Sequence, residues 1–180
     1  MRESGILMHI TSLPAPYGIG TMGKDAYAFV DFLVRAGQRY WQILPLTPTG
    51  YGDSPYQSLG ACAGNHYLID LDRLADEGLL KKEEIQNIPW GSNPARVDFG
   101  AMYAHRMNVL RLAFQRFTPD GAYETFVEQN RSWLEDYALF TALKDTLGGK
   151  PWLDWPEALR LRKADALAEK RRELSEEIRL

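Results

Sequence analysis

The first 44 residues follow a strand–helix–strand pattern, which restricts the chain to few folds. Residues 5–10 are a short apolar run that stops at the breaker-rich segment TSLPAPYGIG, which is typical of a buried strand entering a loop. Apolar residues recur at helical spacing over residues 24–36, and Gly37 stands where a left-handed cap ends such a helix. Residues 40–44 are the second predicted strand. Short links between these elements predict parallel strands with a right-handed crossover, and therefore an α/β fold.

Two loops of this unit are candidates for function. In such folds the functional loops follow the carboxyl ends of the strands. That rule selects residues 11–20 and 47–64, which are rich in Gly, Pro and Tyr. The second loop, of about 18 residues, is longer than most connections in compact domains, and long ordered loops are commonly functional. The alternative is a surface excursion without a ligand.

The rest of the chain is predicted to be mainly helical. Residues 65–71 alternate weakly and predict a third strand or a strand-like edge. Helices are expected at residues 72–78, 82–87, 103–117 and 123–147, where Gly148 and Gly149 end the last of them, and again from about Glu157. We therefore expect a strand-containing part over residues 1–71 and a mainly helical part over residues 72–180.

The C-terminal segment keeps its helical period to Leu180 without a capping signal. We interpret this as truncation, because two or three parallel strands cannot close a (β/α)₈ barrel, which takes about 250 residues. The alternative is a chain that naturally ends in a helix.

Charge and composition exclude several classes of partner. The net charge is −3, with the 21 Lys and Arg residues scattered, so no basic stripe for nucleic acid is present. No apolar run approaches the roughly 20 residues of a membrane span, and the N-terminus lacks a signal-peptide pattern. The single cysteine, Cys62, permits no internal disulfide, and three histidines cannot complete a Cys/His zinc site. We expect a cytoplasmic protein with no nucleic-acid or membrane partner.

The segment LPLTPTGYGDSPYQS, at residues 44–58, is the sharpest candidate for ligand binding. It places Tyr51, Asp53, Ser54 and Tyr56 on a loop stiffened by three prolines. A tyrosine on a rigid loop offers a flat apolar face and a hydroxyl, which suits the C–H face and polar rim of a sugar ring. Carbohydrate is therefore the expected ligand class. The alternative is that Tyr51 and Tyr56 pack beneath the loop and hold it down.

The acidic residues of this region do not form a convincing catalytic pair. Chemistry at a glycosidic bond normally uses two carboxylates, about 5 Å apart when configuration is retained. Asp53 is well explained as a turn residue, and Asp70 and Asp72 are equally explained as solvated acids. The GIGTMG stretch lacks the phosphate-loop lysine, and a G-x-S-x-G elbow is absent. We expect no catalytic residue within this chain.

Four segments together resemble one family: GILMHITSLPAPYGIGTMG, AGQRYWQILPLTPTGYGDSPYQS, AGNHYLIDL and WLEDYALFTALK. They are similar to the 4-α-glucanotransferases (amylomaltase or disproportionating enzyme) of glycoside hydrolase family 77, in order and spacing from about Ser4 onward. The resemblance implies the N-terminal portion of a (β/α)₈ TIM barrel, with its first βαβ unit in residues 1–71 and a helical inserted subdomain in residues 72–180.

The resemblance also implies an activity. Such an enzyme breaks an α-1,4-glucosidic bond, holds the donor as a covalent glycosyl-enzyme and passes it to the 4-hydroxyl of another sugar. The partners implied are maltooligosaccharides or α-1,4-glucans, with no metal or organic cofactor.

Five residues match ligand-binding positions of the family. Ser54 and Tyr56 match residues that line the sugar subsites at the catalytic centre. Tyr51 and Tyr103 match an aromatic pair in a secondary glucan-binding groove. Asn65 matches a position near the donor side. These correspondences predict substrate-binding roles.

The catalytic carboxylates of the family lie on later barrel strands, beyond the part of the pattern present here. We therefore expect this chain to be about the first third of a transferase, inactive alone. Its open strand edges predict self-association or partial disorder. The alternatives are a non-catalytic α-glucan-binding module and an assembly domain based on the charged terminal helix.

Overall fold

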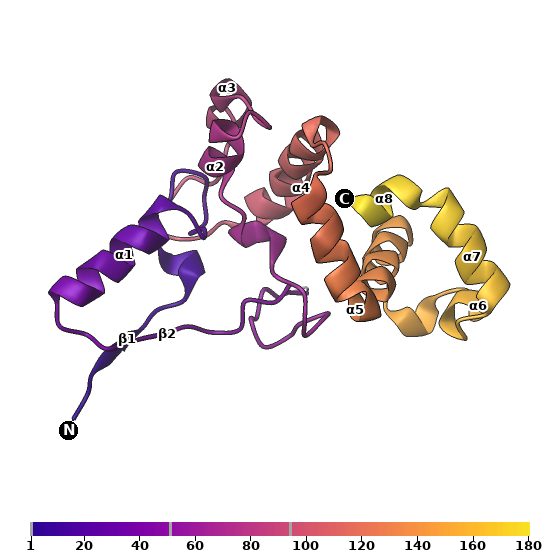
Figure 1. Cartoon of the computed structure of the whole chain (residues 1–180), viewed down its shortest axis with the longest axis horizontal. Coiled ribbons are helices and arrows are strands. Elements are labelled where there is room, and N and C mark those ends of the chain that lie inside the picture. The colour runs from indigo at the N-terminus through magenta and orange to yellow at the C-terminus, as the bar shows by residue number, and fades with distance from the viewer. Residues whose placement is uncertain (1, 51, 94) are drawn as a thin grey trace. The chain divides into compact units, whose positions relative to one another are not determined.

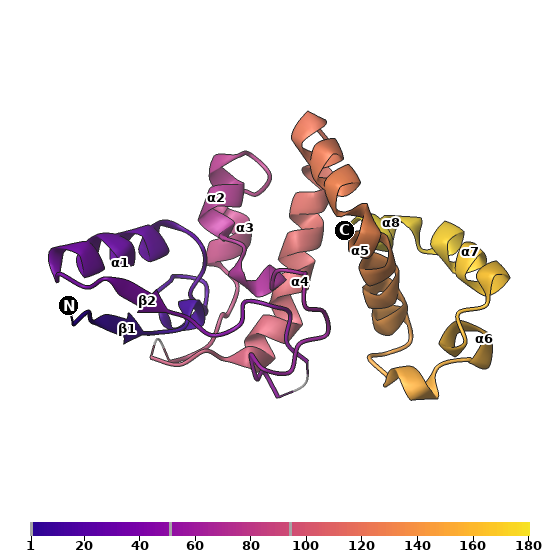
Figure 2. The ribbon, with the colours of Figure 1, turned by 60° about the horizontal axis from the view of Figure 1, so that its bottom comes forward.

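Strands β1 (Gly5–Leu7) and β2 (Tyr40–Gln42) pair in parallel, with Gly5 opposite Tyr40, and helix α1 (Lys24–Arg35) connects them. This confirms the predicted parallel βαβ unit, although each strand is shorter than expected. Figure 2 shows α1 lying along one side of the two strands.

The computed structural model describes residues 2–50, 52–93 and 95–180. The chain divides into two compact units, Met1–Phe117 and Thr118–Leu180 (Figure 1). The boundary expected after residue 71 lies inside the first unit, so the division into barrel and inserted subdomain stays a prediction about the larger fold. In the described part of the chain, no helix is both long and apolar enough to cross a membrane.

Helix α1 ends as its sequence predicts. Gly37 has φ +67°, and its N–H donates to the Val34 carbonyl at 3.0 Å while the N–H of Gln38 donates to Leu33 at 2.9 Å. A left-handed residue at this point satisfies the last carbonyls of the helix at no steric cost for glycine.

The predicted third strand was wrong. Residues 65–71 instead form the 3₁₀ turn η2 (His66–Leu68) and the start of α2 (Leu71–Asp76). The Asn65 side chain accepts a backbone N–H of η2 at 2.9 Å, and the Asp70 side chain caps α2 at the same distance. These short polar side chains offer the backbone local hydrogen bonds that compete with a sheet ladder.

The first unit continues with α3 (Lys82–Gln86) and α4 (Phe99–Arg116). Helix α4 begins four residues before its predicted start, because Asp98 caps it by accepting the Ala101 N–H at 3.0 Å. The core of this unit gathers between the helices and the residue 11–20 loop; its fully buried members are Leu71, Ile85, Met102 and Arg106.

The second unit is helical throughout. Its elements are α5 (Gly121–Thr146), the 3₁₀ turn η3 (Trp152–Asp154), α6 (Glu157–Arg160), α7 (Ala164–Glu173) and α8 (Ser175–Arg179). Gly148 and Gly149 end α5 with φ of +69° and +73°, as predicted. The single helix expected from Glu157 is instead three short ones. The backbone turns at Arg162, where φ is +54°, between α6 and α7, and leaves helical geometry again at Leu174, between α7 and α8.

Candidate functional site

The loop over residues 47–64 is ordered by its own backbone hydrogen bonds. Thr49 and Ser58 form an isolated antiparallel bridge, and the N–H of Gly50 donates to the Gln57 carbonyl at 3.3 Å. At the tip, the N–H of Asp53 donates to the Gly50 carbonyl at 3.2 Å. The loop therefore folds back on itself as a compact unit.

Helix α4 anchors the tip of this loop through Tyr103. The Tyr103 hydroxyl donates to Oδ1 of Asp53 at 2.5 Å and reaches the Gly50 carbonyl at 3.4 Å. Asp53 has φ +57°, a conformation that aspartate tolerates better than most residues and that fits its expected role in a turn. The Tyr103 ring meets the edge of Tyr67, with centroids 6.0 Å apart. The fold thus joins residues about fifty positions apart in sequence.

Of the other predicted loop residues, the structure describes Tyr56 and Ser54. Tyr56 is 72% exposed, so the alternative that it packs beneath the loop was wrong. Ser54 is half-buried, and its hydroxyl accepts the Tyr56 N–H at 3.4 Å. Tyr51 lies outside the described residues. An exposed tyrosine beside a serine hydroxyl offers a stacking face and a hydrogen-bonding group to one ligand.

Asn65 closes the loop, and His66 follows it as a residue that sequence reasoning left aside. The N–H of Asn65 donates to the Leu46 carbonyl at 2.8 Å, which ties the end of the loop to its start. His66 is half-buried, its ring 4.4 Å from that of Tyr67. Burial, followed by the positive charge of Arg106, lowers the pKa of His66 from 6.5 to about 4. The imidazole is therefore neutral at physiological pH.

Arg106 is the second residue that the sequence did not reveal. It is 0% exposed, and its Nη2 donates to the carbonyls of Tyr67, at 3.0 Å, and Ile69. The guanidinium lies 5.8 Å from the centre of the Trp90 ring, a cation–π contact. Burial lowers the pKa of Arg106 to about 10. Its spacing from Tyr103 is i to i+3, which places both residues on one side of α4.

The two carboxylates that follow η2 hold the first loop in place. Asp70 accepts the Thr21 hydroxyl at 2.5 Å, and Asp72 accepts the Tyr17 hydroxyl at 2.6 Å. Burial and the hydrogen bond to Asp72 raise the pKa of Tyr17 above its usual range. The alternative that both acids are simply solvated was therefore wrong, since both make structural hydrogen bonds.

Residues 11–16 of the first loop line a hollow of about 500 Å³ together with Trp90 and Arg96. That volume falls within the roughly 300–1,000 Å³ of ordinary ligand sites. Among the described residues, no three His, Cys, Asp or Glu side chains cluster as metal ligands would.

Comparisons with known proteins show which sequences and structures this chain is similar to. A family model described as 4-alpha-glucanotransferase matches residues 8–180. The chain is 48% identical over 181 residues to the 4-alpha-glucanotransferase of Streptococcus pneumoniae (serotype 4), covering 98% of this chain and 36% of that protein. It is 50% identical over 183 residues to the enzyme of that name from Thermus thermophilus, with the same two coverages.

A solved structure, the amylomaltase of Streptococcus agalactiae in complex with acarbose, matches with a TM-score of 0.93 at 47% identity. The match covers 99% of this chain and 37% of that one. The amylomaltase of Corynebacterium glutamicum, at 19% identity and a TM-score of 0.65, shares the fold. The chain therefore spans about a third of the length of the two curated relatives and of the Streptococcus agalactiae enzyme, and 26% of the Corynebacterium glutamicum enzyme.

Proposed function

The chain belongs to the 4-alpha-glucanotransferase family, and on that premise we propose that it supplies part of the glucan-binding surface of such an enzyme. The complete protein would transfer α-1,4-glucan segments between maltooligosaccharides. The observation that supports this most is the anchored loop, because α4 holds its tip through Tyr103 while Tyr56 stands exposed beside Ser54.

In this proposal the five residues Tyr51, Ser54, Tyr56, Asn65 and Tyr103 contact the glucan. The Tyr56 ring would stack on the apolar face of a glucosyl unit, and the Ser54 hydroxyl would exchange hydrogen bonds with its rim. Tyr103 would contribute its half-exposed ring while its hydroxyl holds Asp53. Their common task is to orient the sugar, with no metal or organic cofactor taking part.

The acids of this surface are committed to other roles. Asp53 accepts the Tyr103 hydroxyl, Asp70 accepts the Thr21 hydroxyl, and Asp72 accepts the Tyr17 hydroxyl. A retaining double displacement needs a nucleophilic carboxylate and a separate acid/base carboxylate. We propose that both come from sequence absent from this chain, which is then inactive alone.

The larger architecture is proposed to be a (β/α)₈ barrel in the cytoplasm, with residues 1–71 at its start and residues 72–180 as a helical insertion. The parallel pair β1 and β2 fits such a start. Apolar side chains on the strands and α1 stay exposed, among them Leu7, Tyr40 and Val34. These surfaces would pack against later strands and helices, and in their absence would favour self-association of the 180-residue chain.

The second candidate is a non-catalytic α-glucan-binding module. It is favoured because Asp53, the acid of the binding loop, already accepts the Tyr103 hydroxyl.

Two measurements on the pure chain test the proposed glucan binding and the proposed inactivity. Incubation with maltotriose should yield no glucose or longer glucans, and turnover would refute the proposed inactivity. A binding titration with maltotriose should show saturable binding, which the transferase and module readings share.

A matched pair of variants tests the site itself. Tyr56→Ala should weaken maltotriose binding about tenfold, since it removes a stacking face. Tyr27→Ala removes a tyrosine of similar exposure, 67%, from α1 and should leave binding unchanged. Equal effects of the two variants, or no binding by the parent chain, would contradict the proposed site.

A further inference from the structure

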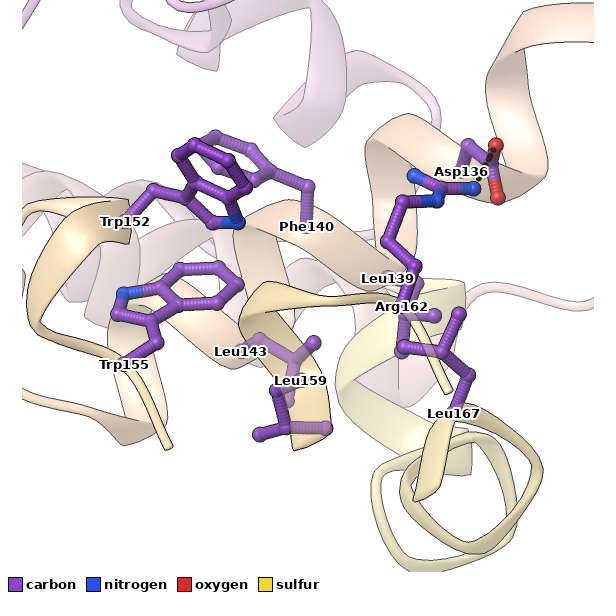
Figure 3. A pocket seen from close by; sticks show the side chains of 9 residues that line it. All are labelled: Asp136, Leu139, Phe140, Leu143, Trp152, Trp155, Leu159, Arg162 and Leu167. Carbon is purple, nitrogen blue, oxygen red and sulfur yellow. Dashed lines mark hydrogen bonds and ion pairs between the residues drawn. The ribbon is translucent and has the colours of Figure 1, made fainter. Parts of the chain in front are cut away.

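The second unit contains an open pocket that the proposed glucan-binding loop does not use. It has a volume of about 270 Å³ and lies among α5, η3, α6 and α7 (Figure 3). Leucine side chains from the three helices complete its lining. This volume is just below the roughly 300–1,000 Å³ of drug-sized ligand sites, so the pocket suits one ring rather than a chain.

One wall of the pocket is aromatic. Phe140 stacks on Trp155, with centroids 5.4 Å apart and planes at 28°, and the indole N–H of Trp155 donates to the Lys150 carbonyl at 3.1 Å. Trp152 is 46% exposed and makes no ring contact with any residue that the structure describes. The wall thus combines a buried, hydrogen-bonded indole with a half-exposed one that also lines the pocket.

The opposite rim is polar. Asp136 accepts Nη2 of Arg162 at 2.7 Å and Nη2 of Arg171 at 3.1 Å. Figure 3 shows the Asp136–Arg162 pair across the pocket from the two tryptophans. A guanidinium has five N–H donors and a carboxylate about four acceptor positions, so the pair keeps hydrogen-bonding capacity for a ligand.

We propose that this pocket binds a single glucosyl unit of an α-glucan, separately from the first unit. A pyranose ring has apolar C–H faces and a hydroxyl rim, which matches an aromatic wall facing a guanidinium–carboxylate pair. Most of the exposed lining is apolar and would meet the C–H face of the sugar, while the ion pair at the rim would meet its hydroxyls. The choice of a glucan rests on the proposed function, whereas the pocket shares no residue with the loop at residues 47–64.

The test is a titration of the ¹⁵N-labelled 180-residue chain with maltose, read at the indole N–H signals of Trp152 and Trp155. Both signals should shift saturably. Trp152→Ala should raise the maltose Kd read from the Trp155 signal about tenfold. Leu153→Ala removes a neighbouring side chain that is 68% exposed and outside the pocket, and should leave that Kd unchanged. No indole shift at about 10 mM maltose, or shifts with phenol but not maltose, would overturn the proposal.

The same spectra separate this site from the first one. In Tyr56→Ala the indole shifts should persist, because the two sites lie in different units. Maltose shifts confined to amides of residues 52–58 would overturn the second site and leave the proposed function standing. Indole shifts without any response of that loop would support the second site and count against the loop.

Discussion

Replacing His66 by glutamine should make the folded protein more tolerant of acid. The folded chain lowers the pKa of this imidazole from 6.5 to about 4, through burial first and the charge of Arg106 second. Between those two pH values His66 is protonated in the unfolded chain and neutral in the folded chain. The free energy of unfolding therefore rises with pH across this window, and the contribution of neutral His66 is lost as pH falls from 6.5 to about 4.

The magnitude follows from the two pKa values. The two pKa values differ by about 2.5, and one pKa unit corresponds to about 1.36 kcal/mol, so the free energy of unfolding should change by about 3 kcal/mol. Water reaches a half-buried ring, which reduces the expected change to about 2–3 kcal/mol. Urea unfolding of the parent chain and of His66→Gln from pH 7 to pH 4 measures it. Because the carboxylates are common to both proteins, their titration cancels in the difference between the two curves.

Two outcomes would refute this reasoning. The first is a pair of unfolding free-energy curves that stay parallel from pH 7 to pH 4. The second is an imidazole signal of His66 that titrates near the ordinary value of 6.5. The contribution of Arg106 is isolated by comparing Arg106→Lys, which keeps the charge, with Arg106→Met, which removes it. The pKa of His66 should be higher in the methionine variant.

Two further substitutions test the anchoring of the loops. Tyr103→Phe removes the hydrogen bond to Asp53 and should lower the free energy of unfolding by about 1 kcal/mol. Hydrogen exchange at the Asp53 amide should become faster, and an unchanged exchange rate would contradict the proposed anchor. Gly20→Ala would drive a Cβ into the Ile10 carbonyl and should cost about 1–3 kcal/mol in urea unfolding, whereas Gly121→Ala, whose Cβ meets open space, should be neutral or stabilising.

The elements that could be predicted are those whose local signals agree. Apolar periodicity and the glycine at position 37 fixed the limits of α1, and the breakers after each strand fixed the βαβ order. Residues 65–71 were misassigned because their weak alternation was outweighed by capping from Asn65 and Asp70. The last helix was misassigned because periodicity does not detect a turn made by a residue such as Arg162.

The candidate site was only partly predictable, because its supports are long-range. The prolines and glycines around Tyr51 and Tyr56 predict that these tyrosines bind a ligand; that role stays a prediction, and Tyr51 lies outside the described residues. Arg106 could not be predicted, since an arginine on an amphipathic helix is ordinarily on the surface. Its burial depends on two backbone carbonyls of the segment after Asn65, which only the folded chain brings to α4.

The residues that hold the loop at residues 47–64 are present in the 180-residue chain, so this chain can test the proposed glucan binding. Two strands of three residues each are marginal as an independent sheet. Tyr103 holds the tip of the loop, and Arg106 holds the segment that follows the loop, from a helix whose core contacts lie within the first unit. The conformation of residues 52–65 should therefore survive the absence of further strands. For that reason, failure of the monomeric 180-residue chain to bind maltotriose would count against the binding loop itself, and the monomer is isolated first because self-association is expected.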